Sequence, residues 1–323
     1  MAMQRFAVLA WLASVTLLAQ AQPAAKLQRI GVIYDSGRYQ SMVEGLRAGL
    51  KDHGMAEGKS FVLHLRDIKE DLAEAQAAAK QLVSERVDVL FTVTTSVSKL
   101  ASEATGDVSI VFYVGDDPVR QGLVQTLARP GGRLTGIHHR RVELVPKRLE
   151  LLHQLLPRAH KIISFYNPAT AVAGHSMNLA RQAASKLGLE LMERPVRSVD
   201  ELISGVRALR PGDADAYFLI GDPTATRGTL QIMPDARQRR LPVVAQDFKL
   251  FDAGALAVYG ANYHDVGRSA ARYVKLVLAG ARPADTPVET YEKVELAISL
   301  RVAKELGISI PEPMVVRADR VIR

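Results

Sequence analysis

From residue 28 onward, short apolar segments alternate with segments of helical spacing. This alternation constrains the fold more than any other feature of the chain. In the first third we predict strands at 29–34, 61–65, 87–93 and 109–114 and helices at 40–53, 72–85 and 96–104. Nearly continuous apolar strands separated by helices of about 10 to 15 residues are typical of a parallel sheet covered on both faces. This part of the chain therefore predicts a doubly wound α/β lobe.

A second series of the same kind follows a break at Arg129-Pro130-Gly131-Gly132. Here we predict strands at 160–166, 189–194, 216–220 and 242–245 and helices at 143–156, 174–187, 200–209 and 225–239. The remaining segments, a strand at 256–263, a helix at 265–279 and a strand with a helix at 294–306, are too small to bury a core alone. We expect them to return to the two sheets, so that several chain crossings form a multi-strand hinge. The expected lobes comprise 22–137 with about 253–286, and 138–252 with about 287–323.

The first residues have the pattern of an export signal. Arg5 precedes the apolar run 6–18, and Ala19-Gln20-Ala21 places small residues where a signal peptidase cleaves. We therefore expect 1–21 to be a signal peptide and the mature chain to be periplasmic. A lipoprotein signal would require a Cys at the cleavage point, and the chain has none, so we expect no lipid anchor.

Composition excludes several classes of site. With no Cys in 323 residues, disulfides, zinc–thiolate sites and Cys nucleophiles are excluded. The 42 Lys and Arg against 34 Asp and Glu give a net charge of +8, but these charges are scattered, and we expect no nucleic-acid partner. The eight His never show His-Glu-x-x-His spacing, His138 and His139 would point to opposite faces of a strand, and Gly-x-Ser-x-Gly does not occur. We therefore expect no enzyme, no catalytic residue, no metal and no cofactor.

The carboxyl ends of the predicted strands are where ligands of parallel α/β sheets bind, because helix N-termini there offer free N–H groups to anions. Hydroxyl, amide, carboxylate and phenol groups follow the strands in both series. The candidate ligand-binding residues are Tyr34, Asp35, Ser36, Thr94, Thr95, Ser96, Tyr113, Asp116, Asp117, Tyr166, Asn167, Ser176, Asp222, Gln246 and Asp247.

Longer motifs of the chain resemble a known family. They include Gly115-Asp116-Asp117-Pro118-Val119, the run from Leu127 to Gly136 with Ala128-Arg129-Pro130-Gly131-Gly132 at its centre, Lys147-Arg148-Leu149-Glu150-Leu151-Leu152, Tyr166-Asn167-Pro168, and Pro283-Ala284-Asp285-Thr286-Pro287-Val288-Glu289. In order along the chain, they resemble the substrate-binding proteins of ABC transporters with the periplasmic-binding-protein-like I fold, in the branch that includes tryptophan and other amino-acid binders. The resemblance implies a hinged, two-lobed receptor, which we expect to be a monomer, that captures a small solute and presents it to an inner-membrane permease.

For a zwitterionic ligand, we expect the carboxylate on Thr94, Thr95 or Ser96 with help from Ser176. Asp116, Asp117 and Asp222 are the candidates for the ammonium group. Aromatic residues at or near the strand ends could enclose an apolar side chain; they are Tyr34, Tyr113, Phe165, Tyr166 and Phe248.

This chain departs from the usual pattern of the family at three places. Thr94-Thr95-Ser96-Val97 stands where a Gly-Thr-x-Ala run is common, Gly115-Asp116-Asp117-Pro118 has an inserted or substituted acid, and Arg133 replaces a frequent Asn. The first two departures fall in the expected pocket, so the identity of the ligand does not follow from that of a relative. A periplasmic sensor that signals to a membrane kinase or chemoreceptor would use the same pocket, and the residues do not separate it from a transport receptor.

Overall fold

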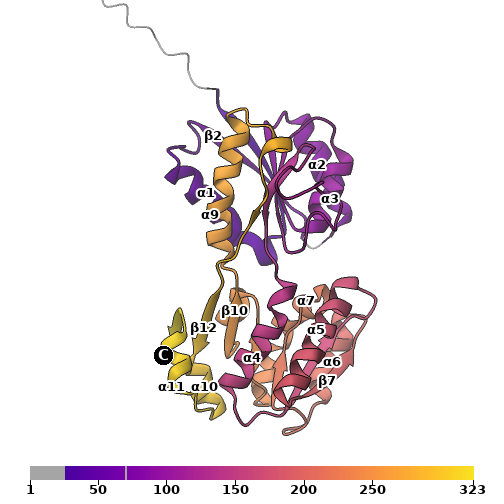
Figure 1. The fold of residues 1–323 in the computed structure, drawn as a ribbon, viewed down its shortest axis with the longest axis vertical. Helices are drawn as coiled ribbons and strands as arrows, with labels where there is room; N and C mark the ends of the chain where they lie inside the picture. The colour runs from indigo at the N-terminus through magenta and orange to yellow at the C-terminus, as the bar shows by residue number, and fades with distance from the viewer. Residues whose placement is uncertain (1–25, 70) are drawn as a thin grey trace, which may run out of the picture.

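The computed structural model describes residues 26–69 and 71–323, and Figure 1 shows two α/β lobes joined by thin connecting segments. Each lobe contains one sheet with helices on both faces. The fold class predicted from the alternating pattern is therefore confirmed. The expected signal peptide, 1–21, lies outside the described residues.

The first lobe is built on a parallel six-stranded sheet of order β11-β5-β4-β3-β1-β2. Its strands are β1 (Gln28–Tyr34), β2 (Phe61–Asp67), β3 (Val89–Val93), β4 (Ile110–Val114), β5 (Leu134–His138) and β11 (Glu289–Thr290). Its helices are α1 (Ser36–Asp52), α2 (Ala73–Ser84), α3 (Thr95–Ala104), α9 (Tyr263–Leu278) and the 3-10 turn η2 (Pro283–Asp285).

The second lobe has a seven-stranded sheet of order β13-β12-β10-β9-β8-β6-β7, in which only the β10–β12 pair is antiparallel among the described residues. Its strands are β6 (Lys161–Tyr166), β7 (Glu190–Pro195), β8 (Ala216–Phe218), β9 (Val243–Ala245), β10 (Ala257–Gly260), β12 (Glu295–Ser299) and β13 (Arg320–Ile322). Its helices are η1 (Val142–Leu144), α4 (Val145–Leu155), α5 (Ala171–Leu187), α6 (Val199–Ala208), α7 (Pro223–Gln238), α8 (Phe248–Asp252), α10 (Leu300–Leu306) and α11 (Glu312–Arg317).

Each sheet has a core on both faces because neighbouring residues of a strand point to opposite sides. In the first lobe, Phe91 packs with α1 and α9, whereas its neighbour Leu90 packs with α2 and α3. In the second lobe, Phe218 faces α4, α5 and α10, and Tyr217 faces α6, α7 and α8. This two-sided burial is why the strands are nearly continuous apolar runs.

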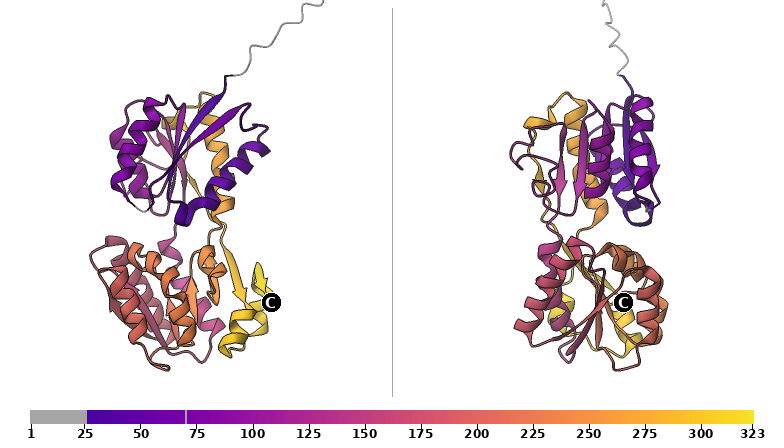
Figure 2. Two further views of the ribbon diagram at one scale, coloured as in Figure 1. Left: turned by 180° about the vertical axis from the view of Figure 1, so that it is seen from behind. Right: turned by 90° about the vertical axis from the view of Figure 1, so that its right-hand side faces the viewer.

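The chain passes between the lobes at 139–141, 261–262 and 291–294, and Figure 2 shows these connections from two further sides. Two segments differ from the lobe boundaries that we expected. Residues 257–260 form β10, which pairs with β9 in the second sheet, and 289–290 form β11, which pairs with β5 in the first. The apolar pattern identifies a strand, but its partner is a distant segment that no local pattern specifies.

Helix α9 returns to the first lobe by packing closely against α1. Glycines line the contact: a Cβ at Gly45 would lie 1.9 Å from the His264 carbonyl oxygen, and a Cβ at Gly267 would lie 2.0 Å from that of Met42. Arg268 also donates to Asp52 at 2.6 Å across the same pair of helices. The second connecting segment, 261–262, is thereby anchored directly to the first lobe.

Candidate functional site

A cavity of about 360 Å³ lies between the two lobes, where the carboxyl ends of their parallel strands face each other. Of the residues proposed from the sequence, those that line it are Asp35, Thr94, Thr95, Ser96, Tyr113, Asp116 and Asp247. The lining also includes residues that the sequence did not single out, chief among them Tyr39, Arg141, Thr226, Arg227 and Lys249. Residues from both lobes and from the first connecting segment therefore form one site.

Tyrosine rings form the apolar wall on the first-lobe side. Tyr39 and Tyr113 line the cavity, and their ring centroids lie 6.4 Å apart. Tyr263, at the start of α9, packs against both rings, at 4.9 Å from Tyr39 and 6.0 Å from Tyr113. All three side chains are buried, and α1 is kinked at Tyr39, whose backbone angles (φ −113°, ψ 16°) are not helical. The wall is therefore held by the same packing that docks α9.

Hydroxyl and carboxylate groups gather where β3 leads into α3. The Thr94 hydroxyl accepts the Val97 N–H at 3.3 Å and caps α3. Thr95 donates its hydroxyl to Asp116 at 3.3 Å, which orients that carboxylate at the cavity. Ser96 is exposed and lines the cavity beside them. The Thr95 hydroxyl is thus already used as a donor within the protein, whereas the Thr94 hydroxyl is used as an acceptor.

The backbone of Thr94 is strained. Its φ of 89° and ψ of 154° lie in a region that is essentially restricted to glycine and that costs a residue with a side chain about 1–3 kcal/mol. Such outliers persist only where the surrounding structure holds them in place, and they are frequent at ligand-binding sites. Thr94 is held by its capping bond and by the Ser98 hydroxyl, which donates to its carbonyl at 2.8 Å.

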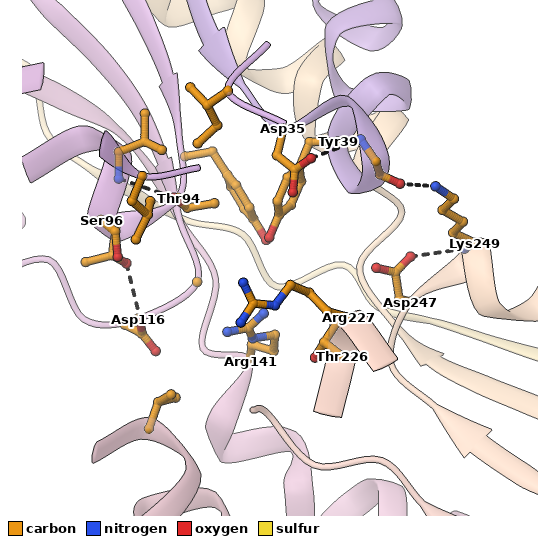
Figure 3. A pocket seen from close by; sticks show the side chains of 18 of the residues that line it. Asp35, Tyr39, Thr94, Ser96, Asp116, Arg141, Thr226, Arg227, Asp247 and Lys249 are labelled. Atoms are coloured by element: carbon orange, nitrogen blue, oxygen red, sulfur yellow. Dashed lines mark hydrogen bonds between the residues drawn. The ribbon is translucent and has the colours of Figure 1, made fainter. Parts of the chain in front are cut away.

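The second lobe and the first connecting segment supply the positive charge. Arg141 comes from the connecting segment, Arg227 from α7 and Lys249 from α8, and Figure 3 shows the guanidinium groups of Arg141 and Arg227 directed into the cavity. The Lys249 ammonium donates to the Gly37 carbonyl of the first lobe.

Two carboxylates of the cavity cap helices. Asp35 and Asp247 cap α1 and α8, accepting the N–H groups of Gly37 and Lys249 at 3.0 Å each.

Comparisons with known proteins identify the family of the chain. The profile of the ABC transporter substrate binding protein family matches residues 15–322. The chain belongs to this family. A tyrosine-binding protein of Clostridioides difficile (strain R20291) is 27% identical over 265 residues, which are 82% of this chain and 76% of that protein.

Two solved structures have the same fold with a TM-score of 0.81 each, and each match covers 92% of this chain and 100% of the other. One is a conserved domain protein from Vibrio cholerae O1 biovar eltor, 29% identical. The other is an ABC domain from Streptococcus pneumonia in complex with L-Trp, 25% identical. The two lobes therefore have the periplasmic-binding-protein-like I architecture that the resemblance implied.

In this substrate-binding protein, four of the proposed residues of the first lobe and of β6 lie outside the cavity. Tyr34 is buried in the first core and its hydroxyl donates to Gln40 at 3.2 Å, while the Ser36 N–H donates to Asp67 at 3.0 Å. Asp117 points to the surface and accepts the Val119 N–H at 2.9 Å. The Tyr166 hydroxyl donates to Glu193 at 3.2 Å. Position after a strand was thus too coarse to select the cavity-lining residue.

The other proposed residues of the second lobe are engaged in local structure instead of lining the cavity. Asn167 accepts the Ala169 N–H at 3.0 Å, and Ser176 is fully buried, 3.5 Å from the Gly221 carbonyl. Asp222 caps α7 through the Ala225 N–H at 2.6 Å, and burial raises the pKa of its carboxyl. Gln246 accepts from the buried Arg148 at 2.6 Å.

Four of the cavity residues that the sequence reasoning missed are Tyr39, Arg141, Arg227 and Lys249. Tyr39 and Arg227 lie within helices, where no strand end marks them. Arg141 lies in a connecting segment, which no strand end marks. Lys249 follows Asp247 by two residues, so the N-cap of α8 was the one sequence signal that could have pointed to it. Within the described ranges 26–69 and 71–323, no cluster of three or more metal-ligating side chains occurs, and no helix is long and apolar enough to cross a membrane.

Two buried histidines, one at the end of β5 and one in the first connecting segment, predict acid sensitivity. Burial lowers the pKa of His139 to about 4, and the guanidinium groups of Arg141 and Arg148 add to the effect. Burial also lowers the pKa of the adjacent His138. The His139 ring packs edge-on against Tyr291 of the third connecting segment, with centroids 6.4 Å apart.

Since an unfolded histidine has a pKa of about 6.5, the unfolded chain binds more protons than the folded one between about pH 6.5 and pH 4. The free energy of unfolding should therefore fall by about 2 kcal/mol between pH 7 and pH 5 on account of His139. Urea denaturation of the ligand-free protein at both pH values measures this loss. His139→Gln should reduce it, and an equal loss in the variant would refute the assignment.

Proposed function

We propose that this substrate-binding protein captures an amino acid in the cavity between its lobes by hinge closure and delivers it to a permease. The carrying observation is that the cavity combines a tyrosine wall, a carboxylate from the first lobe and guanidinium groups from the opposite side. An α-amino acid presents the complementary groups: an ammonium, a carboxylate and a side chain. The names of the relatives, which specify tyrosine and L-Trp, support the same class of ligand.

Asp116 is the group we assign to the ligand ammonium. It lines the cavity, and the Thr95 hydroxyl holds it there. Asp35 and Asp247 accept N–H groups of their own helices, so their lone pairs are in part committed. Tyr39 and Tyr113 form the surface against which an aromatic or aliphatic side chain would pack.

Apolar residues on the facing rims of the cavity support closure. Leu72 of the first lobe is 47% exposed and Leu230 of the second is 38% exposed, and both line the cavity. Large exposed apolar side chains at a concave site are typical of surfaces that become covered. Closure would remove these side chains from water, and their burial would contribute favourable free energy to the closed form. The contacts that the ligand makes with both lobes would add to this contribution.

We also propose that the protein acts outside the cytoplasm. The support is the sequence pattern at 1–21, with its apolar run and small residues at the cleavage point. A receptor of this family in that compartment would meet its permease at the outer face of the inner membrane.

The ligand class is tested by thermal unfolding of the mature protein with amino acids, sugars, nucleosides and aromatic acids. A ligand at 100 times its dissociation constant adds about 2.7 kcal/mol to the free energy of unfolding, which raises the melting temperature by several degrees. We expect amino acids with aromatic side chains to produce the shift. A shift with sugars or nucleosides but none with amino acids would refute the proposed ligand class.

A further inference from the structure

The cavity contains two arginines that come from different parts of the chain. Arg141 lies in the first connecting segment, immediately before η1, and Arg227 lies in α7. Both line the cavity, and Figure 3 shows their guanidinium groups pointing into it. Neither position belongs to the ligand set that the strand ends predicted.

Arg141 is held against the first lobe. If Gly115 carried a Cβ, that atom would lie 3.4 Å from the Arg141 Cζ, so the guanidinium group packs on the backbone at the end of β4. The Arg141 carbonyl accepts from the buried Arg148 at 3.4 Å, and the Arg141 N–H donates to the His139 carbonyl at 2.8 Å. The arginine is therefore fixed at the end of β4, against the residue that precedes Asp116.

Arg227 is placed differently. It is exposed, and among the described residues it makes no hydrogen bond or ion pair. Other arginines of the second lobe are engaged: Arg237, on the same helix, pairs with Glu305, and Arg207 pairs with Asp235 at 3.0 Å. Arg227 acts on the Asp222 carboxyl only through its charge, and it thus brings a guanidinium group from the second lobe to the cavity without a direct partner among the described residues.

We propose that Arg141 and Arg227 together bind the carboxylate of the ligand, with Arg141 binding it in the open protein and Arg227 completing the site on closure. A planar guanidinium group matches a carboxylate through two parallel hydrogen bonds, which gives orientation as well as affinity. This inference rests on the proposed function and reassigns the carboxylate from the hydroxyls at the start of α3 to the two charged donors of the cavity, since the Thr95 hydroxyl already donates to Asp116.

Two consequences follow for specificity. First, the carboxylate would lie next to Asp116, so that one α-carbon could carry both charged groups. Second, a ligand that lacks the carboxylate would make no contact with Arg227, so this contact would not favour closure of the second lobe onto the first. The protein should therefore reject the amine or amide analogue of its amino acid.

The test is calorimetry with L-tyrosine, L-tryptophan, L-tyrosinamide, tyramine and 4-hydroxyphenylpyruvate. We compare wild type with Arg227→Gln and with the control Arg237→Gln, which removes an exposed arginine of the same helix. In wild type we expect the amino acid to bind at least tenfold more tightly than its amide. Arg227→Gln should lower the affinity for the amino acid by about 10- to 100-fold and leave the affinity for the amide unchanged, because only the carboxylate binds the guanidinium group. Arg237→Gln should match wild type.

Arg141→Gln, checked for native circular dichroism, should lower the affinity for the amino acid by a similar factor. The inference is overturned if Arg227→Gln binds the amino acid within twofold of wild type, or if amide and acid bind wild type equally. Binding of the 2-oxo acid but of no amino acid would refute the proposed ligand class and support the arginine site, provided that Arg227→Gln abolishes it. If none of these carboxylates binds, the amino acid that raises the melting temperature in the ligand panel and its amide take their place, and the absence of any such amino acid or other carboxylate would refute both proposals.

Discussion

Replacing Gly45 by Ala should lower the free energy of unfolding by about 3 kcal/mol. The new Cβ would lie 1.9 Å from the His264 carbonyl oxygen and 2.7 Å from the His264 carbonyl carbon, both of which are backbone atoms. A backbone atom cannot rotate away as a side chain can, so α1 and α9 must move apart. Because α9 follows the second connecting segment and carries Tyr263 beneath the tyrosine wall, the shift should also disturb the cavity.

Gly174→Ala is the matched control for this prediction. Gly174 lies in α5, and no atom lies within 4 Å of the position its Cβ would take. The same substitution there should raise the free energy of unfolding by about 0.5–1 kcal/mol, because alanine loses less backbone entropy in a helix. Urea denaturation of both variants measures the difference. Equal effects of the two substitutions would show that α1 and α9 are not packed as closely as described.

Asp116→Asn should weaken amino-acid binding by about 10- to 100-fold. The substitution keeps the size of the side chain and an acceptor for the Thr95 hydroxyl, and it removes the charge that we assign to the ligand ammonium. Hydrogen bonds to a charged group are worth about 1.5–3 kcal/mol, which corresponds to this loss of affinity. Calorimetry with the amino acid found in the ligand panel measures the change.

Asp117→Asn provides the control one residue away. Asp117 is exposed, lies outside the cavity and accepts the N–H groups of Val119 at 2.9 Å and Arg120 at 3.3 Å. Its substitution should leave the affinity within twofold of wild type and cost at most about 1 kcal/mol of stability through the weakened turn. If Asp117→Asn weakened binding as much as Asp116→Asn, the loss would reflect the loop and not the carboxylate at the cavity.

The alternating apolar pattern was enough to predict both lobes, because burial on two faces makes a parallel strand apolar along its whole length. The same pattern left the placement of β10 and β11 open. Strand pairing joins residues far apart in the chain, such as Ala257 with Val244 and Glu289 with Ile137. The hinge was therefore predicted as a multi-strand connection, while the points of crossing required the structure.

At the site, the sequence predicted the groups that directly follow strands and missed those that lie within helices. Thr95 and Asp116 follow β3 and β4 closely, and both line the cavity. Asp116 and Asp117 were indistinguishable, since neighbouring residues of a turn point in different directions that only the backbone angles determine. Arg227 had no signal at all, because one arginine on a helix surface is common and nothing local marks the lobe that faces it.

The most direct test of the central claim is the distance between the lobes with and without ligand. The chain contains no Cys, so Lys99→Cys on α3 and Gln231→Cys on α7, both exposed, would carry the only two nitroxide labels. Double electron–electron resonance on this variant should give a single shorter and narrower distance distribution when a saturating amino acid is added, because contacts to both lobes favour the closed form. An unchanged distribution at a ligand concentration that saturates calorimetric binding would contradict capture by hinge closure.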